Sequence, residues 1–183
     1  MNEFEIKILN FIQDVFSCDF LDFFFKYITK LADKGIFWII LAVVLLFFKK
    51  TRKTGFCLAA ALIIGEILGN QILKRIFERP RPYTVNPDFT PIITKLKSFS
   101  FPSGHTRCSF ECAIAIFLNN KKWGTAALIL AGVIGFSRLY LYMHYPTDVL
   151  AGAILGIIDG FLAVFIVKKI TDAINNRKLK KNI

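Results

Sequence analysis

The chain has 183 residues and a formal net charge of +11, and 55% of its residues are hydrophobic. This length allows one domain, but the apolar share exceeds the roughly 45–50% that is usual for a soluble domain. With 20 phenylalanines, the chain carries more apolar surface than one soluble core could bury, so we predict a polytopic membrane protein. The cations lie in short runs between apolar segments, which is typical of cytoplasmic loops and argues against a nucleic-acid partner.

The first residues predict a helix at the membrane surface rather than a signal peptide, because residues 1–14 mix charged with apolar residues and lack a cleavage site. Residues 4–16 look amphipathic, with one apolar stripe formed by Ile6, Leu9, Ile12 and Phe16. We therefore assign residues 1–17 to an N-terminal interfacial segment, an amphipathic helix. Residues 18–32 are apolar but interrupted by charges, and we predict an irregular membrane crossing there.

Five further apolar segments predict transmembrane helices, since only helices and closed barrels satisfy their backbone in lipid, and long apolar runs lack the alternation of barrel strands. These segments are residues 36–48, 54–73, 103–118, 123–143 and 149–167. Together with the crossing at 18–32 they predict an all-α fold, a six-transmembrane-helix bundle over residues 18–170. Residues 171–183 then form a basic cytoplasmic tail.

Orientation follows from the basic runs, which the positive-inside rule places in the cytoplasm. With residues 49–53 inside, the next helix brings Lys74 to the outer side. The following pair of helices returns the chain to that side at Met143, and the last helix ends inside. Three polar patterns, at residues 74–82, 102–105 and 137–148, are therefore expected on the outer face of the plasma membrane.

The first and third patterns supply cations for an anion. Lys74, Arg81 and Arg138 would surround the equatorial oxygens of a phosphoryl group, over which the transition state spreads its charge. Arg81 lies between two prolines, which push its backbone toward extended geometry beyond the helix that holds Lys74. Its planar guanidinium suits paired phosphate oxygens.

The second pattern, Pro102-Ser103-Gly104-His105, predicts the start of a helix. Ser103 is a good N-cap, because it follows a proline and precedes an apolar run. The free N–H groups and the positive dipole end of such a helix would face an anion, and Gly104 would let a phosphate approach the backbone closely. His105 then lies on the first turn, within reach of a leaving oxygen as a general acid.

The third pattern contains the other of the chain's two histidines. His144 precedes Pro146, a favoured first helical residue, which places Asp148 near the third helical position. From there the carboxylate can reach back as in a capping box, hold one imidazole nitrogen and leave the other free to attack phosphorus. We expect a phosphohistidine intermediate, with His144 neutral and His105 protonated.

The three patterns together resemble those of the type 2 phosphatidic acid phosphatase (PAP2) superfamily: Lys-x6-Arg-Pro, Pro-Ser-Gly-His and Ser-Arg-x5-His-x3-Asp, without a departure. The resemblance covers residues 20–170 and implies metal-independent dephosphorylation without a cofactor, with His144 as nucleophile, Asp148 as its partner and His105 as acid. It also implies that five residues bind phosphate, namely Lys74, Arg81, Ser103, Gly104 and Arg138. The sequence separately predicts no metal, because two histidines this far apart do not make a zinc pattern.

A site at the membrane edge above apolar helices suits an amphiphile whose tail stays in the lipid bilayer, so the expected partner is a membrane lipid phosphate. The resemblance suggests undecaprenyl diphosphate, phosphatidylglycerol phosphate, phosphatidic acid or a phosphate of lipid A. The outer-face site and the small chain favour undecaprenyl diphosphate, with a phosphatidylglycerol phosphate or phosphatidic acid phosphatase as the alternative. A vanadium-dependent haloperoxidase conflicts with the apolar helices, and a non-enzymatic membrane transporter would not explain the polar cluster. No pattern indicates the oligomeric state.

Other features are less specific. The connection at residues 83–101 is either a lid over the site or a tether. The last apolar segment carries a small-residue stripe, expected to pack against a helix of the same chain. This stripe consists of Gly152, Gly156 and Gly160. Arg79 and Arg107 are expected in a solvated pair at the outer rim rather than on a substrate headgroup.

Overall fold

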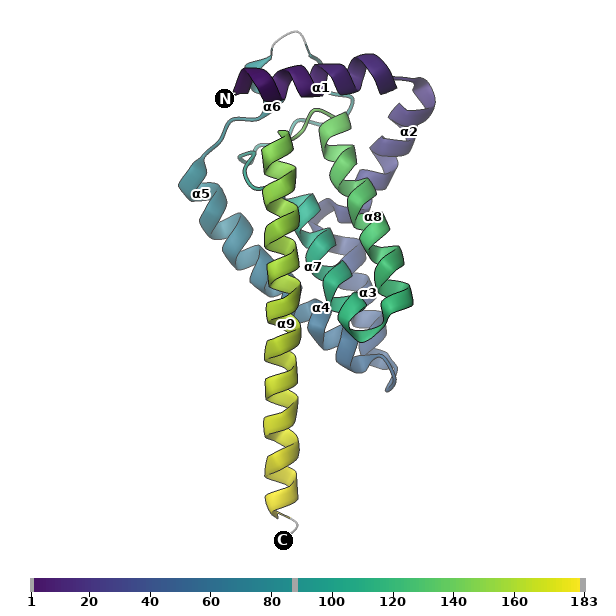
Figure 1. Ribbon diagram of the computed structural model, residues 1–183, viewed down its shortest axis with the longest axis vertical. Helices are drawn as coiled ribbons and strands as arrows, with labels where there is room; N and C mark the ends of the chain where they lie inside the picture. Colours follow the sequence, from purple (N-terminus) through teal and green to yellow (C-terminus); the bar gives the residue numbers. More distant parts are fainter. Residues whose placement is uncertain (1, 87–88, 182–183) are drawn as a thin grey trace.

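The computed structural model describes residues 2–86 and 89–181, and these residues form helices and loops with no strand (Figure 1). The chain begins with α1 (Asn2–Phe16), α2 (Asp19–Ile28), a 3₁₀ segment η1 (Thr29–Gly35) and α3 (Ile36–Phe47). It continues with α4 (Arg52–Gly65), a π-helical segment η2 (Glu66–Leu73), α5 (Lys74–Phe77) and α6 (Pro82–Val85). It ends with α7 (Gly104–Asn119), α8 (Lys121–Tyr140) and α9 (Pro146–Lys181). The predicted all-α class is confirmed.

Helix α7 is the centre of the bundle, because it packs against α8, α9, α4 and η1. Nine of its 16 residues are buried. It begins after Ser103, which caps its first turn, and it ends at Asn120, whose side chain caps the next helix by accepting from the Trp123 N–H at 3.2 Å. Figure 1 shows α9 running along the bundle and beyond it, while α1 lies across the opposite end.

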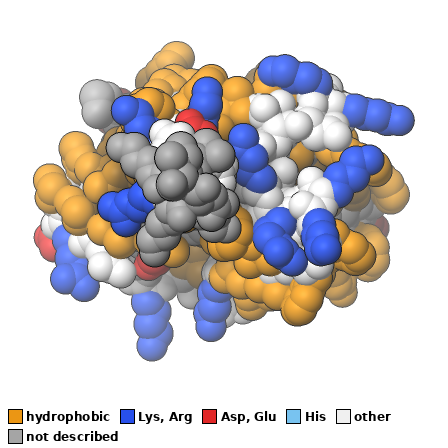
Figure 2. All heavy atoms as spheres, turned by 90° about the horizontal axis from the view of Figure 1, so that it is seen from below, with side chains coloured by type: hydrophobic (Ala, Val, Ile, Leu, Met, Phe, Trp, Pro, Cys, Tyr) orange, Lys and Arg blue, Asp and Glu red, His pale blue; other side chains and the backbone are white. Residues whose placement is uncertain are grey.

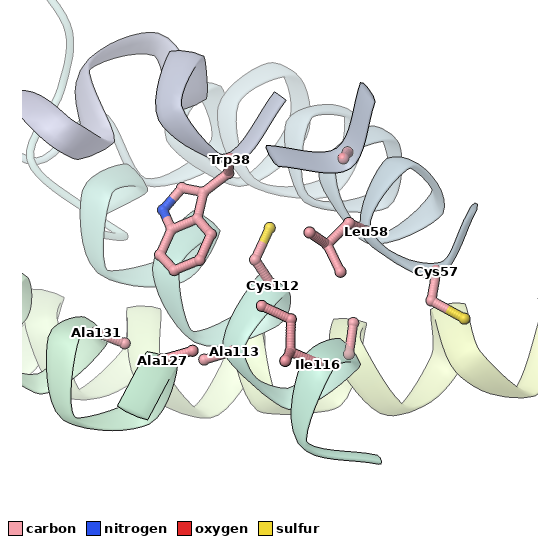
Figure 3. Packing of buried hydrophobic residues seen from close by; sticks show 10 residues of the cluster. Trp38, Cys57, Leu58, Cys112, Ala113, Ile116, Ala127 and Ala131 are labelled. Atoms are coloured by element: carbon pink, nitrogen blue, oxygen red, sulfur yellow. The ribbon is translucent and has the colours of Figure 1, made fainter. Parts of the chain in front are cut away.

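The core around α7 is built from small residues and one tryptophan. Figure 3 shows side chains of α3, α4, α7 and α8 pointing toward one another, with Trp38 beside Cys112 and facing the two alanines of α8. The buried residues of this cluster are Trp38, Ala42, Cys57, Leu58, Cys112, Ala113, Ala115, Ile116, Ala127 and Ala131. The Trp38 indole donates to Ser109 Oγ at 3.3 Å, so its buried polar atom is satisfied.

The glycine stripe of α9 lies against α7 of the same chain, as predicted. A Cβ at Gly152 would stand 2.7 Å from the Ser103 carbonyl oxygen, and a Cβ at Gly156 would stand 2.5 Å from that of Arg107. Helix backbones can approach this closely only where Cβ atoms are missing. The stripe therefore sets the position of the first turn of α9 relative to the first turn of α7.

Helix α1 uses its predicted apolar stripe on the protein itself. Leu9 and Ile12 are buried in a second cluster with Tyr140 and Tyr142, since α1 packs on the end of α8 and on the loop that follows it. Tyr142 also donates to Asn10 Oδ1 at 2.6 Å. The face exposed to the surroundings is a different one, carrying Phe4, Phe11 and Val15, which are 71%, 61% and 56% exposed.

By length and composition, three helical stretches among the described residues could cross a membrane: Arg52–Val85 with 34 residues, Lys121–Tyr140 with 20 and Pro146–Arg177 with 32. The other three predicted crossings lie on shorter helices, since α2 has 10 residues, α3 has 12 and α7 has 16. A straight helix needs about 20 apolar residues to span a bilayer. Length and composition thus identify three of the six predicted crossings.

The two ends of the bundle differ in charge. Figure 2 views the end at which α9 leaves the bundle, where lysine and arginine side chains project among hydrophobic side chains. The turn between α3 and α4, with Lys49, Lys50, Arg52 and Lys53, lies at this end, as does the start of α8. The opposite end, covered by α1, carries the first turn of α9 (Figure 1).

The glycine packing predicts opposite effects for one substitution at two helix positions. Gly156→Ala would force a Cβ against the Arg107 carbonyl and lower the free energy of unfolding by about 1–3 kcal/mol through overpacking. Gly132→Ala in α8 is the matched control, because nothing lies within 4 Å of its Cβ position. It would raise stability by about 0.5–1 kcal/mol through helix propensity. Thermal unfolding in detergent measures both, and equal effects would contradict the packing.

Candidate active site

One cavity of about 620 Å³ lies beside the first turn of α7, bounded by residues of η1 and η2. Five of the eight predicted site residues line it, namely Lys74, Arg81, Gly104, His105 and His144. Asp148 lies against the His144 ring on the side of Nδ1. Ser103 and Arg138 are buried and do not line this cavity. Segments far apart in the chain thus meet at one place.

The surroundings of His144 determine its tautomer. The side chain is buried, and Arg81 Nη1 lies 3.2 Å from Nε2. A guanidinium can only donate, so Nε2 carries the lone pair and the ring proton of the neutral imidazole lies on Nδ1. Nδ1 faces Ser100 Oγ at 3.4 Å and Asp148 Oδ2 at 3.6 Å. The unprotonated nitrogen is therefore Nε2, beside Arg81. Both His144 and Arg81 line the cavity.

Asp148 has the predicted local geometry. Pro146 is the first residue of α9, so Asp148 is the third, and its Oδ2 reaches back to accept from the Tyr145 N–H at 3.0 Å, as in a capping box. Ser100 Oγ also donates to Oδ2, at 2.5 Å. Sequence reasoning missed Ser100, because nothing in the long connection distinguishes this serine from its neighbours.

Arg81 is held by the connection at residues 83–101. Its Nε donates to the Ser98 carbonyl at 2.7 Å, and its Nη2 donates to the Phe99 carbonyl at 3.1 Å. Its Nη1 also donates to the Met143 carbonyl at 2.9 Å. Three carbonyls therefore fix the guanidinium, and the connection positions a cation of the site. Residues 87 and 88 of the connection lie outside the described residues.

The start of α7 confirms the predicted cap. Ser103 Oγ accepts from the Thr106 N–H at 3.5 Å, and the Ser103 N–H donates to the Asp148 carbonyl at 3.1 Å, which joins the first turns of α7 and α9. Gly104 faces the Lys74 ammonium, which would lie 3.6 Å from a Cβ at this position. A side chain here would narrow the space between the helix start and this cation.

Arg138 is buried with part of its guanidinium unmatched. Nη1 donates to Thr29 Oγ1 at 2.5 Å. Nε and Nη2 have no hydrogen-bond partner in the part of the chain that the structure describes. A buried guanidinium with open donors is a strong site for an anion, since leaving them unsatisfied is costly.

His105 lies on the first turn of α7, as predicted, and it contacts a residue that sequence reasoning did not single out. Its Nε2 lies 2.7 Å from Asp33 Oδ1 of η1. Asp33 is 72 positions away in sequence, and no spacing pattern connects the two.

The prediction for Arg79 and Arg107 is wrong. Arg79 is not a solvated rim residue: it forms ion pairs with Asp148, at 2.5 Å, and with the buried Glu5 of α1, and it stacks on the Tyr145 ring at 3.9 Å. Arg107 is buried and pairs with Asp159 at 2.5 Å. Both arginines turn inward because buried carboxylates face them, which the sequence positions did not reveal.

Glu5 therefore belongs to the support of Asp148. Its Oε1 accepts from the Thr147 N–H at 3.1 Å and from Thr147 Oγ1 at 2.6 Å, while its Oε2 binds Arg79. One carboxylate of α1 thus joins the first turn of α9 to the arginine that contacts Asp148. Within the described residues, no group of three or more His, Cys, Asp or Glu side chains could hold a metal ion.

Burial lowers the pKa of His144 well below its ordinary 6.5, and the nearby cations Arg81, Arg138 and Lys74 lower it further. An imidazolium there would be desolvated and repelled by all three. The lowered pKa favours a neutral His144 near pH 7, which is the state that the sequence analysis expected of a nucleophile.

Comparison with known proteins agrees with these patterns. The sequence profile of the PAP2 superfamily matches residues 54–172. An undecaprenyl-diphosphatase of Sulfolobus acidocaldarius is 33% identical over 160 residues, covering 86% of this chain and 74% of that protein. Phosphatidylglycerophosphatase B of Bacillus subtilis is 41% identical over 124 residues, covering 61% and 58%. The crystal structure of LpxE from Aquifex aeolicus superposes with a TM-score of 0.76 at 28% identity, covering 86% of this chain and 93% of that one.

The Glu5 contacts predict that α1 stabilises the site. Glu5→Gln would remove the charge that faces Arg79 in a buried position and lower the free energy of unfolding by about 2 kcal/mol. Glu3→Gln is the matched control, because Glu3 lies in the same helical turn but is exposed, and its effect would stay within about 0.5 kcal/mol. Denaturant unfolding in detergent measures the difference, and equal effects would contradict the role of Glu5.

The lowered pKa of His144 predicts a pH dependence of stability. Below pH 6.5 the unfolded chain gains a proton on this histidine that the folded chain does not, so stability falls as pH falls from about 6.5 toward the folded pKa. The slope from this one group is about 1.4 kcal/mol per pH unit. Unfolding measured between pH 7.5 and 5 would show this slope in the wild type and lack it in His144→Asn. The same slope in both proteins would show that His144 is not buried in the neutral form.

Proposed function

The chain belongs to the PAP2 superfamily, and from this premise we propose that it is a multi-pass membrane enzyme that removes phosphate from a membrane lipid through a phosphohistidine intermediate. As a member of this family it is a phosphatase. The observation that carries the mechanism is the neutral His144, whose Nε2 lone pair lies beside Arg81 at the cavity wall.

In the first step, Nε2 of His144 attacks the terminal phosphorus and a P–N bond forms. The bond from that phosphorus to the leaving oxygen breaks, which releases the lipid monophosphate from a diphosphate and the lipid alcohol from a monophosphate. Arg81 turns its donors from Nε2 to the phosphoryl oxygens as the phosphate enters. His105 gives a proton to the leaving oxygen. The phosphorylated imidazole gains a positive charge, which the nearby Asp148 carboxylate stabilises.

In the second step, water attacks the phosphohistidine and the P–N bond breaks. His105, now neutral, accepts the proton of that water, so the acid of the first step is the base of the second. Inorganic phosphate leaves, and His144 is again neutral. No metal is required, because the charge on the equatorial oxygens is met by protein groups.

The groups that would meet this charge are the Lys74 ammonium, the guanidinium groups of Arg81 and Arg138, the Ser103 hydroxyl and the N–H of Gly104. The open Nε and Nη2 of Arg138 support this assignment. So does the start of the 16-residue helix α7 at Gly104, because the first N–H groups of a helix have no acceptor within it. Fixed cations and N–H donors are worth most in a dry site.

We place the active site at the outer face of the plasma membrane. Because α1 lies at that end and α9 leaves the bundle at the other, residues 18–170 cross the bilayer an odd number of times, and α2, η1 and α3 together make one crossing rather than the two that the sequence predicted (Figure 1). The basic turns at the end opposite α1 support this orientation through the positive-inside rule. Helix α1 lies in the interface with Phe4 and Phe11 toward lipid, rather than with the stripe that packs on the protein. Residues 171–183 form the cytoplasmic tail, of which 182 and 183 lie outside the described residues.

For the substrate we propose undecaprenyl diphosphate. The undecaprenyl-diphosphatases of Sulfolobus acidocaldarius and Bacillus subtilis support this choice, since they match 86% and 88% of this chain. A phosphatidylglycerol phosphate or phosphatidic acid phosphatase is the second candidate. It is favoured by the 41% identity to phosphatidylglycerophosphatase B, over a shorter stretch of 124 residues.

Phosphate release from a panel of lipids tests the function. Purified protein in detergent with EDTA would hydrolyse undecaprenyl diphosphate with a higher kcat/KM than phosphatidylglycerol phosphate or phosphatidic acid. His144→Ala would lower the rate at least about 1,000-fold, because the nucleophile is lost. Its melting temperature controls for folding.

A wild type that turned over [³²P]-labelled substrate would also carry acid-labile, alkali-stable phosphate, as a P–N bond requires. Activity that appeared only with added metal would contradict the mechanism. Near-wild-type activity of His144→Ala would contradict the assignment of the nucleophile.

A further inference from the structure

The second histidine of the site also has a carboxylate partner, on an element outside the three polar patterns. His105 Nε2 lies 2.7 Å from Asp33 Oδ1. An ionised carboxylate can only accept, so Nε2 carries a proton that it donates to Asp33. The hydrogen bond to His105 holds the pKa of Asp33 below its usual range, which keeps this carboxylate ionised. Nδ1 is the nitrogen left for another partner.

The backbone around Asp33 is shaped to present this side chain. Asp33 is followed by Lys34 with φ 52° and Gly35 with φ 68°, two left-handed residues that kink the chain just before α3. For the non-glycine Lys34 this conformation costs about 1–2 kcal/mol. Such strain persists only where surrounding contacts determine the backbone, and it gathers at functional sites.

The contacts that hold this turn come from the site itself. Thr29, at the start of η1, accepts from Arg138 Nη1 at 2.5 Å. The Ala32 carbonyl, next to Asp33, faces Cys108 Sγ of α7 at 4.0 Å, one turn after His105. The segment with Asp33 is thus tied to a cation of the site and to the helix that carries His105.

The charges that face His105 explain why a carboxylate matters there. Burial of the ring disfavours a proton most, and Arg138 of α8 and Lys74 of α5 add to this effect, as does His144 when charged. On its own helix, Arg107 and Glu111 follow on the next turns and line the same cavity. Asp33 is the anion in direct contact with the ring, and it acts against these effects.

We propose that Asp33 is the positioning residue that holds His105 as an imidazolium, with Nε2–H donated to the carboxylate and Nδ1–H directed to the leaving oxygen. This inference rests on the proposed phosphatase function. In the first step the Nδ1 proton passes to the leaving oxygen as the P–O bond breaks, and the ring becomes neutral. In the second step Nδ1 takes a proton from the attacking water, which restores the imidazolium.

Comparing two leaving groups tests the proposal. Asp33→Asn would lower kcat/KM for an alkyl phosphate about tenfold or more, because the leaving alkoxide needs a proton. It would leave kcat/KM for p-nitrophenyl phosphate near the wild-type value, because p-nitrophenolate departs without one. Asp33→Glu would restore part of the alkyl phosphate activity. Asp14→Asn removes the same charge from an exposed position of α1 and would change neither value.

A second measurement tests the His105–Asp33 ion pair without relying on catalytic activity. The chain has two histidines, so the imidazole signals in an NMR titration can be assigned with His144→Asn. In Asp33→Asn, His105 would lose its proton at a pH about one to three units lower than in the wild type, because its counter-charge is gone.

The outcomes separate the two claims. A wild type that released no phosphate from any lipid would overturn the proposed function, and the titration would still decide whether Asp33 and His105 form a charged pair. An active wild type whose Asp33→Asn variant lost activity equally on both phosphate esters, or gained activity, would overturn the role of Asp33. So would an unchanged His105 titration.

Discussion

A guanidinium has hydrogen-bond donors and no acceptor, and this asymmetry determines the state of the whole site. Because Arg81 can only donate to Nε2 of His144, the ring proton lies on Nδ1, toward Ser100 and Asp148. Arg81 is itself oriented by backbone carbonyls of the connection at residues 83–101. The tautomer of the nucleophile therefore depends on a loop that carries none of the reacting groups. The sequence left open whether this connection is a lid or a tether. Its contacts show a third role, because it holds the guanidinium of Arg81 in place.

Arg138 and Lys74 act on both histidines, so the two rings can differ in charge only if their other surroundings differ. Asp148 pairs with Arg79 at 2.5 Å, and at the unphosphorylated His144 its charge is outweighed by burial and by the surrounding cations. The side chain of Asp33 is 53% exposed and contacts His105 directly. The contacts of each carboxylate thus help to explain why His144 would be neutral and His105 charged. The His144–Asp148 and His105–Asp33 pairs are therefore not equivalent, although each joins a histidine to a carboxylate.

The sequence predicted those parts of the site that local chemistry determines. Pro146 and Asp148 begin α9, and Ser103 begins α7, because capping depends on residues three or four positions apart. The glycine stripe of α9 could be predicted for the same reason, since its spacing follows from the helix repeat. The supporting residues could not be predicted in this way. Glu5 lies 142 positions from Thr147 and His105 lies 72 from Asp33, and nothing in composition or period marks such pairs. Sequence reasoning placed Arg79 at the rim because it could not identify Glu5 as its partner.

Glu5 and Asp33 also share a position in the chain, whereas the missed Ser100 lies within the matched part. The family match begins at residue 54, whereas Glu5 and Asp33 both precede it. The matched part contains both histidines, Asp148 and all the predicted phosphate ligands. The first 53 residues contribute the carboxylates that face Arg79 and His105, and through them they act on the charge state of each histidine. Glu5 of the N-terminal helix and Asp33 in the turn before α3 thus supply charged contacts to the matched residues, and under our proposal the charge of Asp33 also sets the protonation of His105.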